Sequence, residues 1–368
     1  MGIPEVSIGG TGDVNQTKRP LLALLNAVRG RCGSLIQVHN NPDPDAIGAA
    51  VAMRFLYERY LGIQSRIVFG GIVGRAENRA MLRLLGIQLV PASKVDYDEC
   101  DLLTLVDTQP GAGHTDLPGH KVPHVVIDHH PPREKPAGVL YWDVGREVGA
   151  TCTIIAELLL RNHVSLPRNV ATALMYGIKS DTHDLSLEAT PTDIAAYQML
   201  LTQGDPAMLA QIENARVPRS YYAVFGMAIE NAIIYDFACV SHLGRIDNPD
   251  LVAEMADFLL RCEDLRWSLV TGVYEETLHL SVRATGKGAH AGEVARQAVG
   301  VMGSAGGHGH MAGGQVPLGD CDKATRNKIV SAVTNLFIDA VKAKRTLMTR
   351  LTQDTLPDET DTTFFTQE

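Results

Sequence analysis

Residues 38–46 place one imidazole and two carboxylates close together, directly after a run of apolar residues. These side chains are His39, Asp43 and Asp45, and their types and spacing are those of metal ligands. The preceding apolar run predicts a buried strand, so the three side chains should lie at its carboxyl end. Open α/β sheets bind their ligands at that end of the strands. The stretch is therefore a candidate metal site.

The two aspartates have an alternative role as caps of the helix that follows them. Residues 46–53 are small and apolar, which predicts a tightly packed helix, and Asp is a favoured capping residue. The positive N-terminus of that helix would also favour an anion at the same place. This stretch alone leaves metal ligation and capping equally supported, so the other strands must decide.

Similar side chains follow other apolar runs of the chain. Residues 101–106 and 125–127 predict two more strands, and residues 171–178 form a longer apolar stretch. The acidic and histidine residues that follow these runs are Asp107, Asp128, His129, His130 and Asp181. Carboxylates gathered at one sheet edge repel each other unless a cation neutralises them. The whole set therefore predicts bound divalent metal more strongly than any one member does.

Short apolar strands alternate with helical stretches from residue 21 to about residue 203, which predicts a doubly wound parallel sheet. The predicted strands are residues 35–38, 66–69, 101–106 and 125–127. The predicted helices are residues 21–28, 46–60, 77–85, 151–162, 168–178 and 192–201. The alternation lapses after residue 203, so residues 204–220 are expected to be a linker.

A second, smaller α/β domain is expected over residues 221–345. It contains a predicted helix, 249–261, and a predicted hairpin formed by residues 265–274 and 277–284. Apolar and polar residues alternate along the second strand of the hairpin, which places Arg283 on the polar face. The pattern alone does not separate a solvated strand arginine from a ligand-binding one.

Residues 303–314 contain six glycines in twelve positions. Such a density costs folding entropy and is tolerated where backbone must approach a ligand closely. Successive N–H groups of a glycine-rich loop can form an anion-binding nest. A flexible surface loop is the alternative, but His308 within the run favours the ligand-binding interpretation.

The amino-acid composition restricts the binding partners and the cellular location that can be expected for this protein. The net charge of -9 and the pI of about 5.8 provide no global basic field to hold a long nucleic-acid duplex. The six cysteines are scattered without a metal or disulfide spacing, which predicts reduced thiols and a cytoplasmic location. No apolar run approaches the length of a membrane span. Residues 1–19 are expected to be a flexible leader and residues 346–368 an acidic tail.

The motifs together resemble those of the DHH phosphoesterase family. In the family's order they are residues 39–46, 106–108, 128–130, which read Asp-His-His, and 180–182. A fifth motif, Gly306-Gly307-His308, resembles the glycine-rich substrate loop of the first type of DHH-associated C-terminal domain. Pro44 and Ala305 depart from the pattern, because the family often has glycine at each place. Both flank the expected ligands rather than replace them.

The resemblance implies a DHH domain over residues 20–203, a DHH-associated substrate-binding domain over residues 221–345, and an active site in the cleft between them. It also implies two bound metal ions, and the mixed imidazole and carboxylate ligands favour Mn²⁺, with Mg²⁺ or another divalent ion as alternatives. By resemblance, one ion is held by His39, Asp43 and Asp107, and the second by Asp45, Asp107, His129 and Asp181, with Asp107 bridging.

The resemblance assigns roles to the remaining motif residues as well. Asp128 would orient a histidine, and His130 would contact the phosphate or assist the leaving oxygen. The residues that would bind the substrate are Arg283, Gly306, Gly307 and His308.

The activity that the resemblance implies is hydrolysis of phosphodiester or phosphomonoester bonds by a metal-activated water. The branch most like this chain is that of the oligoribonucleases and 3′-phosphoadenosine 5′-phosphate phosphatases, which act on nanoRNA and pApA. Short single-stranded oligonucleotides or small nucleotides are therefore the expected partners. The alternatives are a processive RecJ-like exonuclease, a linear or cyclic dinucleotide phosphodiesterase, and a non-catalytic nucleotide-binding regulator. The pyrophosphatase branch is less favoured because its C-terminal domain differs from the one expected here. A homodimer is a possible oligomeric state.

Overall fold

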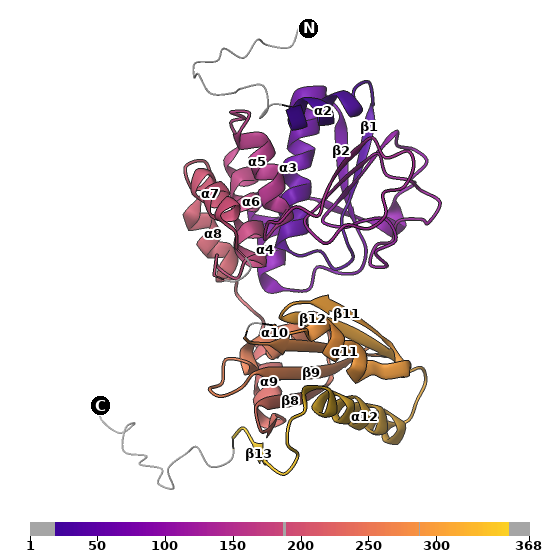
Figure 1. Cartoon of the computed structure of the whole chain (residues 1–368), viewed down its shortest axis with the longest axis vertical. Helices are drawn as coiled ribbons and strands as arrows, with labels where there is room; N and C mark the ends of the chain where they lie inside the picture. The colour runs from indigo at the N-terminus through magenta and orange to yellow at the C-terminus, as the bar shows by residue number, and fades with distance from the viewer. Residues whose placement is uncertain (1–18, 187–188, 287, 353–368) are drawn as a thin grey trace, which may run out of the picture. The chain divides into compact units, whose positions relative to one another are not determined.

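The computed structural model describes residues 19–186, 189–286 and 288–352, and the chain divides into two compact units between Arg216 and Val217 (Figure 1). We call them the N-terminal unit and the C-terminal unit. The predicted leader lies outside the described residues except for its last residue, and the predicted tail is described only as far as residue 352. None of the helices in the described ranges is long and apolar enough to cross a lipid bilayer.

A parallel six-stranded sheet forms the centre of the N-terminal unit. Its strands are β1 (Gly33–Gln37), β2 (Gln64–Phe69), β3 (Leu89–Pro91), β4 (Leu102–Val106), β5 (Val125–Asp128) and β6 (Tyr141–Val144). The order β3-β2-β1-β4-β5-β6 reverses direction between β1 and β4, which makes these two strands the switch point of the sheet. The predicted parallel sheet is confirmed, and the strands not predicted, β3 and β6, are the short strands at its two edges.

Seven helices of the N-terminal unit pack into one core with β1, β2, β4 and β5 (Figure 1). They are α2 (Arg19–Ala27), α3 (Pro44–Leu61), α4 (Ala76–Leu85), α5 (Thr151–Leu160), α6 (Arg168–Asp181), α7 (Pro191–Leu201) and α8 (Pro206–Glu213). The opposite face of the sheet presents Leu35, Val68 and Leu103, which pack against the short helix η1 (Ala92–Lys94) and loops. The strand order is thus that of a doubly wound sheet, while loops replace the second layer of helices.

Two glycines allow α3 and α6 to approach each other closely. A Cβ atom at Gly48 would lie 2.6 Å from the carbonyl oxygen of Ala173, and one at Gly177 would lie 3.0 Å from Cα of Asp45. Larger side chains would push the two helices apart. This packing brings Asp45, in the first turn of α3, close to Asp181, the last residue of α6.

Helix α8 lies within residues 204–220, the stretch expected to be a linker. Its residues Leu209 and Ile212 are buried in the core of the N-terminal unit. The division between the units falls after this helix, at Arg216.

The C-terminal unit is built on a mixed seven-stranded sheet with the order β11-β12-β10-β9-β8-β7-β13. Its elements are α9 (Arg219–Glu230), β7 (Ile233–Tyr235), β8 (Ala238–Arg245), α10 (Asp250–Leu259), β9 (Trp267–Tyr274), β10 (Thr277–Ala284), α11 (Ala291–Val299), η2 (Gly300–Met302), β11 (Ser304–His308), β12 (Met311–Pro317), α12 (Lys323–Val341) and β13 (Met348–Arg350). The predicted helix and hairpin are confirmed as α10 and β9–β10. One face of the sheet packs on α11 and α12, and the other packs on α9 and α10.

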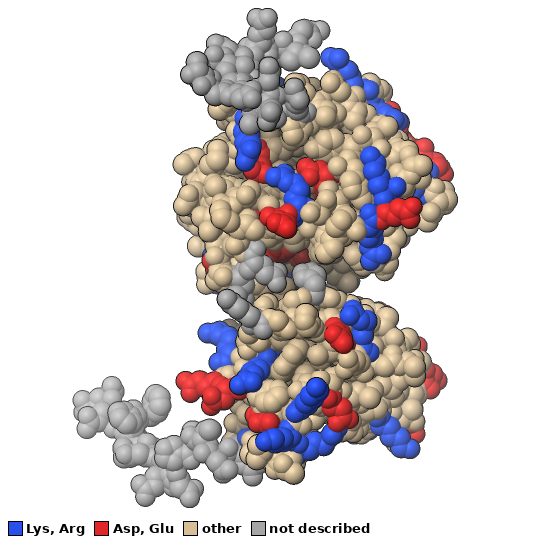
Figure 2. Space-filling model, in the orientation of Figure 1, with Lys and Arg blue, Asp and Glu red and all other residues tan. Residues whose placement is uncertain are grey.

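The surface carries charges of both signs. On the face shown in Figure 2, basic and acidic side chains are interspersed over each unit, with large uncharged areas between them.

Candidate metal centre

The switch point of the N-terminal sheet positions the first group of predicted ligands. His39 lies just beyond β1, and Asp107 directly follows β4. Asp43 caps α3, because its side chain accepts the backbone N–H of Ala46 at 3.0 Å. Asp45 lies in the first turn of α3 and is fully buried. Capping therefore accounts for Asp43 but not for the burial of Asp45.

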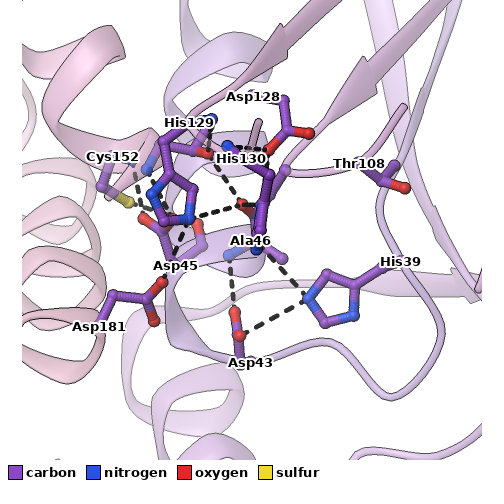
Figure 3. Close-up of polar contacts among 12 residues, drawn as sticks. His39, Asp43, Asp45, Ala46, Thr108, Asp128, His129, His130, Cys152 and Asp181 are labelled. Carbon is purple, nitrogen blue, oxygen red and sulfur yellow. Dashed lines mark hydrogen bonds and ion pairs between the residues drawn. The ribbon is translucent and has the colours of Figure 1, made fainter. Parts of the chain in front are cut away.

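The second group of predicted ligands comes from β5 and α6. Asp128 ends β5, His129 and His130 follow it, and Asp181 ends α6. Figure 3 shows His129 and Asp181 on one side of the cluster and His39 on the other, with Asp43 beneath them. The structure thus brings together all six residues that were expected to ligate metal.

The distances within the cluster suit donors that share a cation. Nε2 of His39 lies 3.6 Å from Oδ2 of Asp43 and 3.5 Å from Oδ2 of Asp107. Nε2 of His129 lies 3.7 Å from Oδ1 of Asp107 and 3.7 Å from Oδ2 of Asp181. These separations exceed hydrogen-bond length.

The chemistry of the two histidines also fits a metal site. Nε2 of His129 is buried and has no hydrogen-bond partner among the described residues, and Nδ1 lies 3.3 Å from the carbonyl oxygen of Val148. In the neutral imidazole Nδ1 then carries the proton, so the Nε2 lone pair points into the cluster. His39 is held in the same way by the carbonyl oxygen of Asn40, 2.9 Å from its Nδ1. A buried acceptor without a partner is costly, and a cation between these side chains would remove that cost.

The ligand atoms form three overlapping groups in which all atoms lie within 4.8 Å of one another. The groups are His39, Asp43 and Asp107; Asp45, His129 and Asp181; and Asp107, His129 and His130. The first two correspond to the ligand sets implied by the resemblance, although Asp107 is absent from the second. Asp107 belongs to two groups, as a bridging ligand would, and the third group also includes His130.

Two carboxylates of the cluster, Asp45 and Asp181, have pKa values raised above the usual range of aspartate. Burial and the neighbouring Asp107 raise the pKa of Asp45 to about 7. Burial, Asp43 and Asp45 raise the pKa of Asp181 well above its usual range. Burial opposes the charge of His39, but Asp43 and Asp107 outweigh it and raise the pKa of that imidazole. Binding of a cation to these groups must therefore release protons.

Asp128 orients His130 rather than His129. Oδ1 of Asp128 lies 2.8 Å from Nδ1 of His130, and Oδ2 accepts a hydrogen bond of 2.7 Å from Nε2 of Gln109. Burial opposes a charge on His130, but the hydrogen bond to Asp128 and the nearby Asp107 raise its pKa to about 9. These carboxylates therefore favour the protonated form of His130.

Sequence reasoning missed three residues at this site. Gln109 follows β4 by three positions, at the same sheet edge as Asp107, which was an available signal. Thr151 is the first residue of α5. The helix was predicted, but the contacts of the Thr151 side chain were not predicted. His114 packs edge-on against His39, with ring centroids 5.8 Å apart, and it comes from a loop without a chemical signature.

Arg283 lies on a covered face of β10 and not on an open polar face, as its alternation pattern suggested. Its side chain is only 9% exposed, because α10 covers this face of β10, and its Nε atom forms an ion pair with Asp257 of α10. Nη1 donates a hydrogen bond of 2.7 Å to Oγ of Ser281, which is also buried. Apolar and polar residues therefore alternate along β10 although both faces of this strand are covered.

The glycine-rich run forms the β11–β12 hairpin instead of a loop, and His308 pairs with Met311 across its turn. A Cβ atom at Gly292 of α11 would lie 2.0 Å from the carbonyl oxygen of Gly307, so glycine here serves helix packing. A Cβ atom at Gly306, in contrast, would meet nothing within 4 Å. Arg283 also pairs with Met311, so the predicted substrate-binding residues lie at one end of neighbouring strands.

The fold and the site define a two-unit α/β protein whose N-terminal sheet carries a carboxylate and histidine cluster at its switch point. Residues 34–178 match the N-terminal domain of the DHH family, and residues 235–337 match the DHHA1 domain. The chain belongs to the DHH family and carries a DHHA1 domain.

Two curated relatives and one solved structure show the extent of the similarity. The chain is 35% identical over 312 residues to an uncharacterized protein of Methanocaldococcus jannaschii, covering 84% of this chain and 63% of the relative. It is 32% identical over 156 residues to a probable manganese-dependent inorganic pyrophosphatase of Lactobacillus acidophilus, covering 42% and 49%. The chain thus spans less than two thirds of the length of either relative. An exopolyphosphatase-related protein from Bacteroides fragilis shares the fold, with a TM-score of 0.69 at 14% identity, covering 88% of this chain and 98% of that protein.

Proposed function

We propose that this protein is a divalent-metal-dependent hydrolase of short oligonucleotides or small nucleotide phosphoesters. The observation that carries the proposal is the cluster at the switch point, where the buried Nε2 atom of His129 has no hydrogen-bond partner among the described residues and faces Asp107 and Asp181. A purely structural cluster would pair this nitrogen. A metal site needs its lone pair.

The proposed ligands are His39, Asp43, Asp45, Asp107, His129 and Asp181. Two divalent ions suit this mixture of imidazole and carboxylate ligands. Mn²⁺ is the preferred ion, and Mg²⁺ is the alternative. The relative from Lactobacillus acidophilus, described as manganese-dependent, supports this choice. When bound, such ions lower the pKa of a water molecule and stabilise the charge that develops on phosphorus.

His130 and Asp128 are the proposed catalytic pair. The hydrogen bond to Asp128 holds Nδ1 of His130 and raises the pKa of the imidazole. A cationic imidazole can contact a phosphate oxygen or give a proton to the leaving oxygen. Gln109 fixes the other oxygen of Asp128 and so limits rotation of the pair.

The C-terminal unit is proposed to bind the end of the substrate that does not react. Gly306, which the packing does not require, leaves space for a ligand beside the backbone. Gly307 and His308 continue this strand, and Arg283 lies two strands away at the same end of the sheet. These four residues are the proposed substrate-binding group. The net charge of -9 favours a short substrate over a long polyanion.

A reducing compartment, the cytoplasm, is the proposed location. All the cysteines of the chain are free thiols, and Cys152 and Cys239 are buried. This arrangement is typical of proteins that are not exposed to oxidising conditions.

The proposed activity is tested by a substrate panel with Mn²⁺ present and with the metal removed by a chelator. The panel contains pApA, longer oligoribonucleotides, 3′-phosphoadenosine 5′-phosphate, a cyclic dinucleotide and pyrophosphate. We expect pApA and 3′-phosphoadenosine 5′-phosphate to be hydrolysed fastest, and only with metal. Hydrolysis of pyrophosphate alone would support the pyrophosphatase branch. Tight nucleotide binding without turnover would support a regulator and overturn the proposal.

A further inference from the structure

We propose that Thr151 is a positioning residue that holds three of the proposed metal ligands from one point at the N-terminus of α5. The inference rests on the proposed metal centre. It adds a residue that does not itself ligate, and it makes the metal affinity depend on a single hydroxyl group.

Three contacts of Thr151 carry the inference. Its hydroxyl donates a hydrogen bond of 2.8 Å to Oδ1 of Asp107, and its backbone N–H donates one of 2.7 Å to Oδ2 of Asp45. The backbone N–H of His129 donates to the hydroxyl oxygen at 3.2 Å. Thr151 is fully buried, so these bonds are not shared with bulk water. One residue thus connects ligands from α3, β4 and β5.

The geometry suits a group that prepares a site for a cation. The Thr151 hydroxyl donates its single proton to Asp107 and accepts the backbone N–H of His129. Only this orientation of the hydroxyl allows both hydrogen bonds. Asp45 also accepts the N–H of Cys152 at 2.7 Å, so both of its oxygens are held by the first turn of α5 (Figure 3). Each carboxylate oxygen keeps a second lone pair for a metal ion. Partners that fix ligands in this way typically change metal affinity by about 10- to 100-fold.

The start of α5 is itself held from a second side. The hydroxyl of Thr153 and the backbone N–H of Gly149 both donate to the buried carboxylate of Asp193, which also closes the capping box of α7. Thr153 therefore resembles Thr151 in residue type, burial and helix, but it bonds a carboxylate outside the metal cluster. It provides a matched control.

The experiment titrates metal-free protein with Mn²⁺ by calorimetry and compares Thr151→Val, Thr151→Ser and Thr153→Val with the wild type. Valine keeps the shape of threonine and removes the hydroxyl. We expect Thr151→Val to weaken Mn²⁺ binding by about 10- to 100-fold and Thr151→Ser to restore most of it. Thr153→Val should lower the thermal stability and leave the Mn²⁺ affinity unchanged. Raising the Mn²⁺ concentration should recover much of the kcat that Thr151→Val loses.

Two results would overturn the inference. One is Mn²⁺ affinity in Thr151→Val equal to that of the wild type. The other is equal loss of affinity in Thr151→Val and Thr153→Val, which would show a general structural effect. If Thr151→Val does not fold, the comparison of Thr151→Ala with Thr151→Ser decides, because only serine keeps the hydroxyl. Wild-type protein that binds Mn²⁺ but hydrolyses none of the substrate panel would refute the proposed function alone, since the affinities would still test Thr151.

Discussion

Oδ2 of Asp107 lies 3.5 Å from Nε2 of His39, while Oδ1 of the same carboxylate faces Nε2 of His129 at 3.7 Å. The side chain is 1% exposed, and its backbone has a φ of 56° in the left-handed region. Asp and Asn are among the few residues that adopt this conformation readily. The strand end therefore turns sharply and directs one carboxylate toward two histidines.

The first prediction follows from this arrangement. Asp107→Asn should abolish turnover, by about a thousandfold or more, because the loss of a charged bridging ligand affects both proposed ions. Asparagine tolerates the backbone conformation and can still accept the hydroxyl of Thr151, so the fold should persist. The measurements are the metal content per chain, the rate of hydrolysis and the circular dichroism spectrum. Two tightly bound ions per chain in the variant would disprove the bridging role.

The second prediction concerns the stability of the metal-free protein as a function of pH. The raised pKa of Asp45 means that the folded state holds a proton that the unfolded chain has lost, so this contribution disappears as the pH rises through about 7. The raised pKa of His130 acts in the same direction, and its contribution is lost as the pH rises through about 9. The melting temperature of the metal-free protein should therefore fall between a pH of about 5 and a pH of about 9.

Mn²⁺ should reverse this trend, because the cation replaces the protons on the carboxylates and binds more tightly as they are lost. The gain in melting temperature on adding Mn²⁺ should accordingly grow with pH. Asp181→Asn removes one of the carboxylates with a raised pKa and should flatten the metal-free profile. A metal-free melting temperature that is constant or rises over this range would contradict the prediction.

The proximity of the candidate ligands in the N-terminal unit could be predicted because the signals there were local. His39, Asp107 and His129 follow strands within two positions, and the carboxyl ends of parallel strands meet at one edge of a sheet. The grouping of His39 with Asp107 needed only that rule. The contacts of Thr151 could not be predicted in this way, because its partner Asp45 lies 106 positions away and is reached only through the packing of α3 and α5.

The C-terminal unit was harder to predict because its residues depend on neighbouring layers. Arg283 has the spacing of a polar strand residue, but α10 covers it, and a local pattern does not reveal that a second layer exists. The glycine run has two explanations that sequence does not separate. Gly307 is required because a Cβ atom there would meet Met311 and Ala312 of β12, whereas Gly306 has open space beside it.

The third prediction uses this difference between the two glycines. A Cβ atom at Gly307 would lie 2.3 Å from the carbonyl oxygen of Met311 and would also meet Ala312, so Gly307→Ala should lower the melting temperature by several degrees. Gly306→Ala should leave the stability unchanged and raise KM for pApA about tenfold or more, because the methyl group occupies space proposed for the ligand. His308→Ala should also impair dinucleotide turnover while Mn²⁺ binding persists. Wild-type KM in both Gly306→Ala and His308→Ala would return this hairpin to a structural role.

The fourth prediction separates two roles of Arg283. Arg283→Met should raise KM for dinucleotides with Mn²⁺ still bound, and it should also lower the stability because the ion pair with Asp257 is broken. Asp257→Asn breaks the same pair but keeps the guanidinium group, so it is the matched control. We expect the increase in KM to be at least about tenfold larger for Arg283→Met, the scale of one charged contact. Equal changes in the two variants would assign Arg283 to the ion pair alone.

The last prediction is a preference for short substrates. Under the proposed function, the scissile phosphate binds the metal centre of the N-terminal unit and the far end of the substrate binds the C-terminal unit, so length is measured from one end. Basic side chains are interspersed with acidic ones on the face in Figure 2, and the net charge is -9, so each added nucleotide should bring little binding and some repulsion. We expect kcat/KM at fixed salt to be highest for about two to five nucleotides with a free 5′ end, and to fall for longer chains. A continuous rise in kcat/KM from a dimer to a twenty-mer would instead favour a processive RecJ-like exonuclease.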